Sequence, residues 1–189
     1  MKKILAVFIL MLSLGGMQAQ EYKNQIKGNM LFAPLGILNV GYEHAFNQHW
    51  TGQADIFISP WKSFAGKNLQ IYMGHVEARY YFTKAMEKWY VGANVGLGVY
   101  NMQKWNYWSL NDRYQKGFNY MIGGTVGYQL KLSDRWNIDF YVGGGASQSF
   151  YHGWYKDKYP RQRYDSAQAW NKSGEFIPFR GGAMISYKF

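Results

Sequence analysis

The sequence predicts an all-β fold: a single eight-stranded antiparallel up-and-down transmembrane β-barrel. Three observations predict it. Apolar and polar residues alternate with a period of two along most of the chain, as in strands that bury one face. Short and long connections alternate between these segments, and the chain is rich in aromatic residues (20%) and in glycine (22 residues). A length of 189 residues suits one domain.

The first residues are typical of a secretory signal peptide, residues 1–19, followed by the barrel, residues 20–189. Lys2 and Lys3 precede an apolar run from Ile4 to Leu14, and Ala19 ends a small-residue cleavage site. That run is shorter than the roughly 20 residues of a spanning helix. The absence of cysteine excludes disulfides and a lipidated cysteine anchor. Without the signal, 19 basic and 11 acidic residues leave a net charge of +8, which favours lipopolysaccharide phosphates as partners and not nucleic acid.

Alternation is clearest from Phe118 to Leu132, which we expect to form a hairpin with the segment from Trp136 to Phe150. The eight predicted strands cover residues 25–33, 38–47, 49–60, 69–82, 88–103, 117–131, 135–151 and 177–189. Tight turns at 47–49, 83–88 and 133–135 alternate with longer loops near 61–68, 102–117 and 152–176. This asymmetry is typical of outer-membrane barrels and predicts periplasmic termini. Pro34, Pro60 and Pro178 are expected at strand ends.

Alternation alone does not say which face is outside, because a lipocalin-like soluble barrel alternates with its apolar face inward. Trp50, Trp89 and Trp136 follow the three tight turns, and Phe189 ends the last strand on the same parity. These four residues predict an aromatic girdle at a membrane interface. We therefore expect the apolar face toward lipid and the glycine-rich polar face toward a narrow lumen.

The polar face carries charges of both signs, which must pair or stay hydrated in a closed lumen. The sequence predicts a structural network that plugs the barrel, formed by Glu43, Asp55, Glu77, Arg79, Asp139 and Arg180. Lys27, Lys131 and Lys188 share this face, and His75 is expected to be a hydrogen-bonded lumen residue. No spacing matches a zinc or calcium site, so neither a metal nor another cofactor is expected.

Several short motifs, in their order along the chain, resemble a known family. They are Asn39-Val40-Gly41-Tyr42-Glu43, Ser59-Pro60-Trp61, Glu77-Ala78-Arg79-Tyr80-Tyr81, Tyr100-Asn101, Gly127-Tyr128-Gln129-Leu130 and Ser186-Tyr187-Lys188-Phe189. The family consists of small outer-membrane barrels of Bacteroidota-type bacteria and is known as a domain of unknown function. The resemblance implies a barrel in the outer membrane and an anchoring or accessory role beside fimbriae or other envelope proteins, and it brings no catalytic residues. The terminal Phe189 also resembles the signal read by the barrel insertion machinery.

The long loops combine aromatic and basic residues, which suit binding of sugars, lipopolysaccharide phosphates or a surface protein, and equally suit docking onto the headgroup layer. The binding candidates are Trp105, Trp108, Arg113, Trp154, Lys156, Lys158, Arg161, Arg163 and Trp170. We expect a non-enzymatic structural, anchoring or surface-binding role. The alternatives are a narrow pore and a lipid-modifying enzyme of the lipid A deacylase or acyltransferase type, with Ser149, His152 and Asp157 as the best local set.

Overall fold

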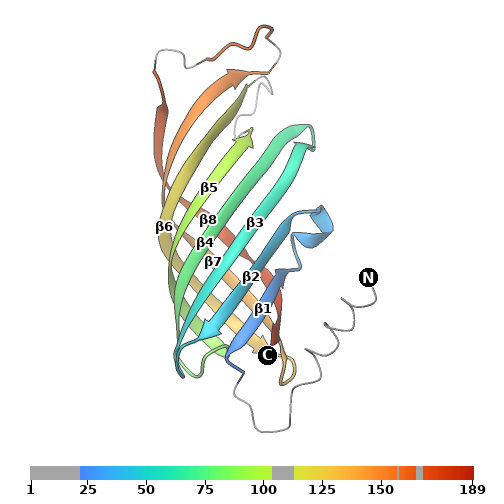
Figure 1. The fold of residues 1–189 in the computed structure, drawn as a ribbon, viewed down its shortest axis with the longest axis vertical. Coiled ribbons are helices and arrows are strands. Elements are labelled where there is room, and N and C mark those ends of the chain that lie inside the picture. Colours follow the sequence, from blue (N-terminus) through green and yellow to red (C-terminus); the bar gives the residue numbers. More distant parts are fainter. Residues whose placement is uncertain (1–21, 104–112, 157, 165–167) are drawn as a thin grey trace, which may run out of the picture.

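The computed structural model describes residues 22–103, 113–156, 158–164 and 168–189. The predicted fold class is confirmed, because eight antiparallel strands follow one another around a closed barrel and β1 pairs with β8 (Figure 1). The strands are β1 (Asn24–Asn29), β2 (Leu38–Ala45), β3 (Trp50–Phe64), β4 (Lys67–Tyr81), β5 (Lys88–Met102), β6 (Arg113–Lys131), β7 (Trp136–Tyr155) and β8 (Asn171–Lys188). A short 3-10 turn, η1 (Ala33–Leu35), lies between β1 and β2. No helix within the described ranges is long and apolar enough to cross a membrane.

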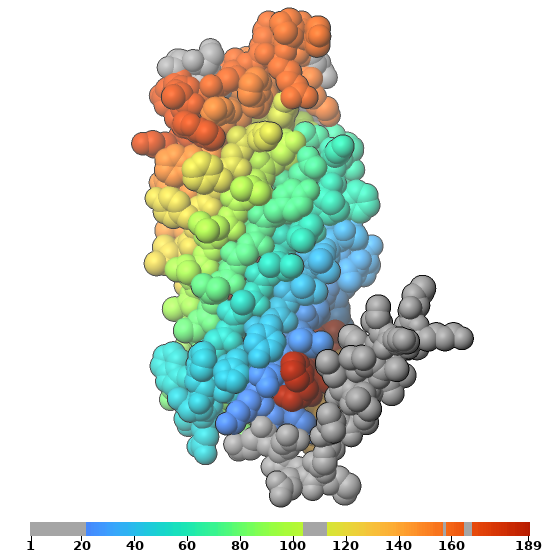
Figure 2. Space-filling model, viewed as in Figure 1, coloured from blue at the N-terminus to red at the C-terminus, as the bar shows by residue number. Residues whose placement is uncertain are grey.

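The two faces of the wall differ sharply, because successive side chains of a strand point to opposite sides of the sheet. On β5, Val95 and Leu97 are 49% and 70% exposed, whereas Asn94 is 2% exposed. Figure 2 shows the outer side of β3 to β6, coloured cyan to yellow, as one slanting surface. The buried residues are mostly polar or charged. The polar face therefore lines the lumen, and the apolar lumen of a lipocalin-like barrel is excluded for the half of the barrel near the turns.

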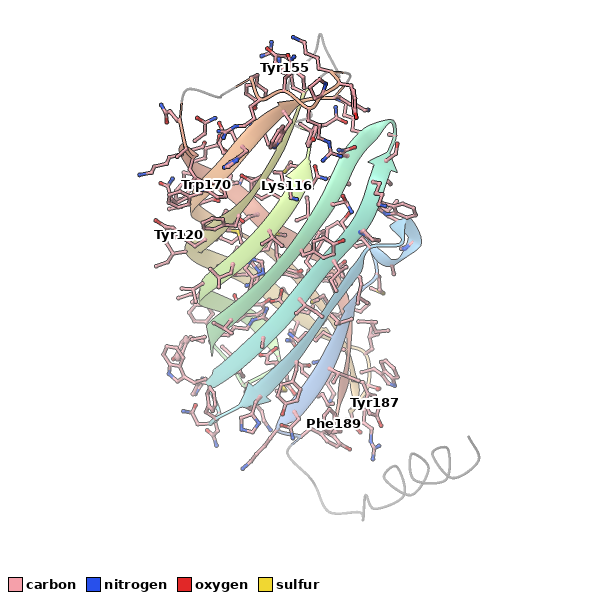
Figure 3. All side chains as sticks on the ribbon, turned by 45° about the horizontal axis from the view of Figure 1, so that its top comes forward. Lys116, Tyr120, Tyr155, Trp170, Tyr187 and Phe189 are labelled. Carbon is pink, nitrogen blue, oxygen red and sulfur yellow. The ribbon has the colours of Figure 1, made fainter. Side chains whose placement is uncertain are left out.

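The tight turns and the C-terminus lie at the same end of the barrel. Figure 3 places Tyr187 and Phe189 at this end, and Lys116, Tyr155 and Trp170 at the other. The β4–β5 turn folds under the barrel, where Met86 is 1% exposed and its carbonyl accepts a hydrogen bond from Asn137 Nδ2 at 2.8 Å. The opening of the barrel at this end is thus covered by the turn itself.

Several predicted boundaries at the opposite end are wrong. The expected loop near 61–68 is a two-residue hairpin turn, in which Ala65 and Gly66 have φ values of 49° and 78°. Such left-handed pairs match the twist of the flanking strands. β6 begins at Arg113 and β7 runs to Tyr155, because these residues extend the β6–β7 ladder. β8 begins at Asn171, so the expected loop 152–176 is shorter than predicted.

The first two strands are shorter than predicted. Because β1 ends at Asn29, the β1–β2 hairpin stops well below the neighbouring strands. β1 stops at Asn29, whose side chain accepts a hydrogen bond from the Leu31 N–H at 3.1 Å, and η1 follows. Pro60 and Pro178 lie inside β3 and β8 and not at strand ends. Both positions lie beyond the residues that β2 and β1 pair with, so the missing N–H removes no bond to those strands.

Candidate functional site

Arg79 of β4 is the centre of a buried charge network inside the barrel. Its side chain is fully buried and its Nη1 donates to Glu43 Oε2 at 3.2 Å and to Asp139 Oδ2 at 2.9 Å. Its Nε donates to Glu77 Oε2 at 2.8 Å. The guanidinium also lies 4.4 Å above the ring of Tyr90. One cation on β4 thereby connects carboxylates from β2, β4 and β7 across the lumen.

The carboxylates of this network have further donors, which offset the cost of burying their charge. Lys27 of β1 forms ion pairs with Glu43 and with Asp139, the latter at 2.6 Å. Tyr81 donates to Glu43 at 2.7 Å, and Tyr90 donates to Asp139 at 2.8 Å. These tyrosines were missed by the sequence reasoning, although they share the parity of the lumen charges.

A second cluster lies beside the first. Arg180 Nη2 donates to Asp55 Oδ1 at 2.5 Å, and its Nη1 lies 3.3 Å from Glu77 Oε2. His75 Nδ1 lies 3.4 Å from Asp55 Oδ2. The His75 ring stacks on Phe179 with ring centroids 5.9 Å apart. Glu77 contacts both Arg79 and Arg180, so the two clusters form one network.

The structure brings together all six charged residues predicted to plug the lumen, from five different strands. The prediction that Lys131 faces the lumen is wrong. Its side chain is 51% exposed at the β6–β7 turn and pairs with Asp134 at 2.9 Å. The hydrogen bond with Lys131 lowers the pKa of the Asp134 carboxyl. Lys131 is the last residue of β6, so its side chain lies at the end of the barrel and is exposed to solvent. Among the described residues, no group of three or more His, Cys, Asp or Glu side chains is placed to hold a metal ion.

Each predicted girdle tryptophan pairs with a tyrosine on the adjacent strand. The ring centroids are 5.2 Å apart for Trp50 and Tyr80, 5.1 Å for Trp89 and Tyr128, and 5.0 Å for Trp136 and Tyr187. Phe189 is 52% exposed at the same end, and its backbone N–H donates to the Asn24 carbonyl at 2.9 Å. An exposed ring of aromatic side chains thus surrounds the end that carries the tight turns.

At the other end, aromatic and basic side chains form a pocket of about 590 Å³ on the outer face, which we call the rim pocket. Trp170 lies 4.0 Å from the His152 ring and 5.7 Å from Phe118, measured between centroids. Lys116 also lines the pocket (Figure 3). Lys172 Nζ lies 5.9 Å from the neighbouring ring of Phe150. Rings with nearby ammonium groups can stack on a sugar and bind its phosphate.

The structure separates the predicted loop candidates into several places. Trp154 and Trp170 line the rim pocket, which also contains Lys116, a residue that was not predicted. The guanidinium of Arg113 lies 5.3 Å from the rings of both Tyr155 and Tyr164. The other described candidates are Lys158 over the Tyr155 ring at 4.3 Å, Arg163 donating to the Gln168 carbonyl at 2.7 Å, and the exposed Lys156 and Arg161. Trp105 and Trp108 lie outside the described residues.

The residues considered for lipid chemistry do not converge. Ser149 and His152 are three positions apart on β7, so their side chains point to opposite faces of the wall. Ser149 shares the inward parity of the buried Ser147, whereas His152 lines the rim pocket outside. Asp157 lies outside the described residues.

Eight up-and-down strands around a charged lumen, with apolar side chains and aromatic rings outside, define a small closed β-barrel. The chain belongs to the family described as Protein of unknown function (DUF3575), whose model matches residues 5–189. The predicted resemblance to an uncharacterised barrel family is thus confirmed. The NMR solution structure of the E. coli Outer Membrane Protein W is similar, with 11% sequence identity, a TM-score of 0.44, and coverage of 91% of this chain and 100% of that chain. A comparison with curated proteins found no match.

Proposed function

We propose that this protein is an integral outer-membrane barrel with a non-enzymatic role, which holds a glycan- or phosphate-binding rim at the cell surface. The observation that carries the proposal is the belt of exposed apolar side chains around the barrel. It includes Ile26, Val40, Ile56, Val76, Val95, Leu97, Ile122, Val126, Phe140 and Val142. Soluble monomers rarely expose apolar patches larger than a few hundred Å². Lipid, by contrast, is a favourable surrounding for such a belt.

Strand lengths agree with this location. A strand needs about 9 to 11 residues to cross a bilayer on a tilt, and β3 to β8 contain between 15 and 20 residues each. The aromatic pairs at the turn end mark one interface. The surplus length then raises the opposite ends, with the rim pocket, to the level of the outer headgroups. By the rule for such barrels, the turns and both termini are periplasmic.

The lipid-facing assignment predicts the effect of placing a charge in the belt. Val95→Arg, six residues beyond the girdle residue Trp89, is expected to lower the stability of the vesicle-inserted barrel by about 2–4 kcal/mol, the cost of an arginine facing the bilayer midplane. The measurement is the urea dependence of the difference in gel migration between unheated and boiled samples. Ser63→Arg, at the exposed end of β3, is the matched control and should leave the transition unchanged. Equal stability of both variants and the parent would contradict a membrane location.

The rim is proposed to bind phosphorylated glycans such as the lipopolysaccharide headgroup. Trp170→Ala and Lys116→Ala are each expected to weaken binding of lipopolysaccharide to the purified barrel roughly tenfold, a loss of about 1.4 kcal/mol. The reason is the loss of a stacking ring in one variant and of an ammonium group in the other. Binding is measured by calorimetry in detergent, with Lys23→Ala at the opposite end as the control. Equal weakening by all three changes would point to non-specific charge attraction and contradict the rim site.

The two alternatives draw less support from the geometry. A hydrolase or acyltransferase needs a nucleophile and a base within hydrogen-bonding reach, and Ser149 and His152 are on opposite faces of β7. A pore needs an open lumen, whereas the Arg79 network crosses it and Met86 covers its lower end. Anchoring and surface binding require neither a nucleophile–base pair nor an open lumen.

A further inference from the structure

The barrel wall is incomplete above the β1–β2 hairpin. The register of β1 with β8 ends at Asn29 and Met184, and that of β2 with β3 ends at Leu38 and Ile58. β8 nevertheless extends to Asn171, and β3 extends to Phe64. In Figure 1 the blue hairpin ends near mid-height, well below the neighbouring strands. Residues 30–37, which include η1, occupy part of the gap between β3 and β8.

The gap begins at the depth of the bilayer. β1 has six residues, and six residues at ~3.3 Å each, tilted by about 45°, rise only about 14 Å. The apolar band of such a barrel is about 25 Å tall. Measured from the girdle at the turn end, the gap therefore faces the hydrocarbon of the outer leaflet.

The strands on the two sides of the gap contain proline, a residue typical of sheet edges. Pro60 on β3 and Pro178 on β8 lie on opposite sides of it, and proline within a sheet is confined to edges and bulges. The loop is fastened to the β3 side, where Trp61 Nε1 donates to the Leu35 carbonyl at 2.9 Å. On the β8 side, the described hydrogen bonds above the register are the Met30 N–H donating to the Ala183 carbonyl at 2.9 Å and Asn29 Nδ2 donating to the Gly181 carbonyl at 3.4 Å. The opening therefore lies between the loop and β8.

Behind the gap the lumen contains a cavity of about 420 Å³. Its inner wall is apolar, in contrast to the charged half of the lumen below. On β3 and β4 the inward positions change from Asp55 and His75 to Phe57, Ile71 and Met73. A bulge in the β7–β8 register, between Gly143 and Gly144, brings both Phe179 and Arg180 to the inner face. The loop adds Leu31 and Phe32 at the mouth.

The floor of the cavity is polar and is not fully satisfied. Asp55, His75 and Arg180 line it. Within the described part of the chain, Arg180 Nε and His75 Nε2 are buried without a hydrogen-bond partner. A hydroxyl suits Arg180, because it can accept from the guanidinium, whereas the Nε2 edge of His75 faces Gly96 of β5, which does not line the cavity. A carboxylate suits Arg180 less, because the buried acids already equal or outnumber the buried bases. The acids are Glu43, Asp55, Glu77 and Asp139, and the bases are Lys27, Arg79, Arg180 and, near the turns, Lys188.

We infer that the cavity takes one hydrocarbon chain with an uncharged polar end, entering sideways from the outer leaflet between β8 and residues 30–37. The polar end reaches the Arg180 guanidinium, and the chain lies against Phe57, Ile71 and Phe179. The volume is within the range of small-molecule sites, which are mostly apolar with a few placed polar groups. This inference rests on the proposed membrane location.

The test uses a photoreactive fatty alcohol, hexadecanol with a diazirine in its chain, added to phosphatidylcholine vesicles that contain the full mature barrel. Irradiation should label the inward residues Phe57, Ile71, Met73 and Phe179. Unlabelled hexadecanol should reduce this labelling severalfold, and hexadecanoate should reduce it less. Ile71→Trp, which fills the cavity, should also reduce it severalfold, whereas Val76→Trp on the outer face of β4 should not.

Insertion is measured separately by the gel shift and by protection from added protease. An inserted barrel labelled at Val76 and Val95 but not at the inward residues would overturn the inference and leave the membrane location standing. A barrel that does not insert would overturn both. Where Ile71→Trp fails to fold, competition by unlabelled hexadecanol decides: undiminished labelling of the inward residues overturns the site.

Discussion

Replacing Arg79 with methionine is expected to destabilise the barrel by about 3–5 kcal/mol, the usual cost of removing one partner from a buried ion pair. Three carboxylates lose their shared cation, and the side chain that replaces it can donate no hydrogen bond. Lys27 remains near Glu43 and Asp139 but does not reach Glu77 in the described contacts. Glu77 then keeps only Arg180, whose Nη1 lies 3.3 Å from its Oε2, and is the carboxylate left with the fewest partners.

The urea midpoint of the gel shift, together with the slope of the transition, measures the effect of Arg79→Met. The double variant Arg79→Met, Glu77→Met removes both partners and should recover part of the loss, because a buried charge that has lost its main partner costs more than an apolar pair. Lys131→Met removes the cation of an exposed pair and should produce no measurable change. A single variant as stable as the parent would mean that the lumen charges are solvated and do not form a dry plug.

Replacing Gly145 with valine is expected to destabilise the barrel by about 3 kcal/mol or more, the upper end for overpacking. A Cβ atom at Gly145 would lie 2.2 Å from the Ile122 carbonyl oxygen and 2.5 Å from Gly123 Cα. Both are backbone atoms of β6, so no side-chain rotation relieves the clash. The ladder between β6 and β7 must shift, and that is the longest pairing in the barrel.

Gly28→Val is the matched control, because a Cβ atom there meets nothing within 4 Å. Gly28 is on the outward parity of β1, between the buried Lys27 and Asn29. The control should insert with the yield and urea midpoint of the parent. If Gly145→Val does the same, then β6 and β7 do not approach as closely as the structure has them.

The sequence was most informative where one local pattern decides the structure. Period-two alternation located the eight strands, and the parity of Glu77 and Arg79 correctly placed both inside. Neighbouring aromatic residues separate by the same rule: Tyr80 and Trp89 lie outside, whereas Tyr81 and Tyr90 donate hydrogen bonds inside. The residue type alone does not say whether an aromatic side chain faces outward or into the lumen, whereas its parity along the strand does.

The remainder depends on contacts between distant segments. The apolar residues Phe57, Ile71 and Met73 lie on the parity of the lumen charges. Alternation along a single strand does not show that they line one cavity, because they belong to two strands. Phe179 points inward because of a bulge against β7, which alternation along β8 does not reveal. The early end of β1 likewise follows from the fold of residues 30–37 and from their attachment to Trp61. Alternation along a strand predicts which side of the wall a residue faces, whereas the pairing between strands determines where each strand ends.

The seam between β1 and β8 joins the two ends of the chain through five registered residue pairs, whereas β6 and β7 share nineteen. The other pairings form between strands adjacent in sequence, but this one must close a loop of nearly the whole chain, at the largest entropic cost. Lys27 crosses from β1 to Asp139 on β7 and thereby links strands that do not pair with each other. The buried ion pairs consequently stabilise the finished ring more than any separate hairpin, so closure is the step of assembly at which they contribute.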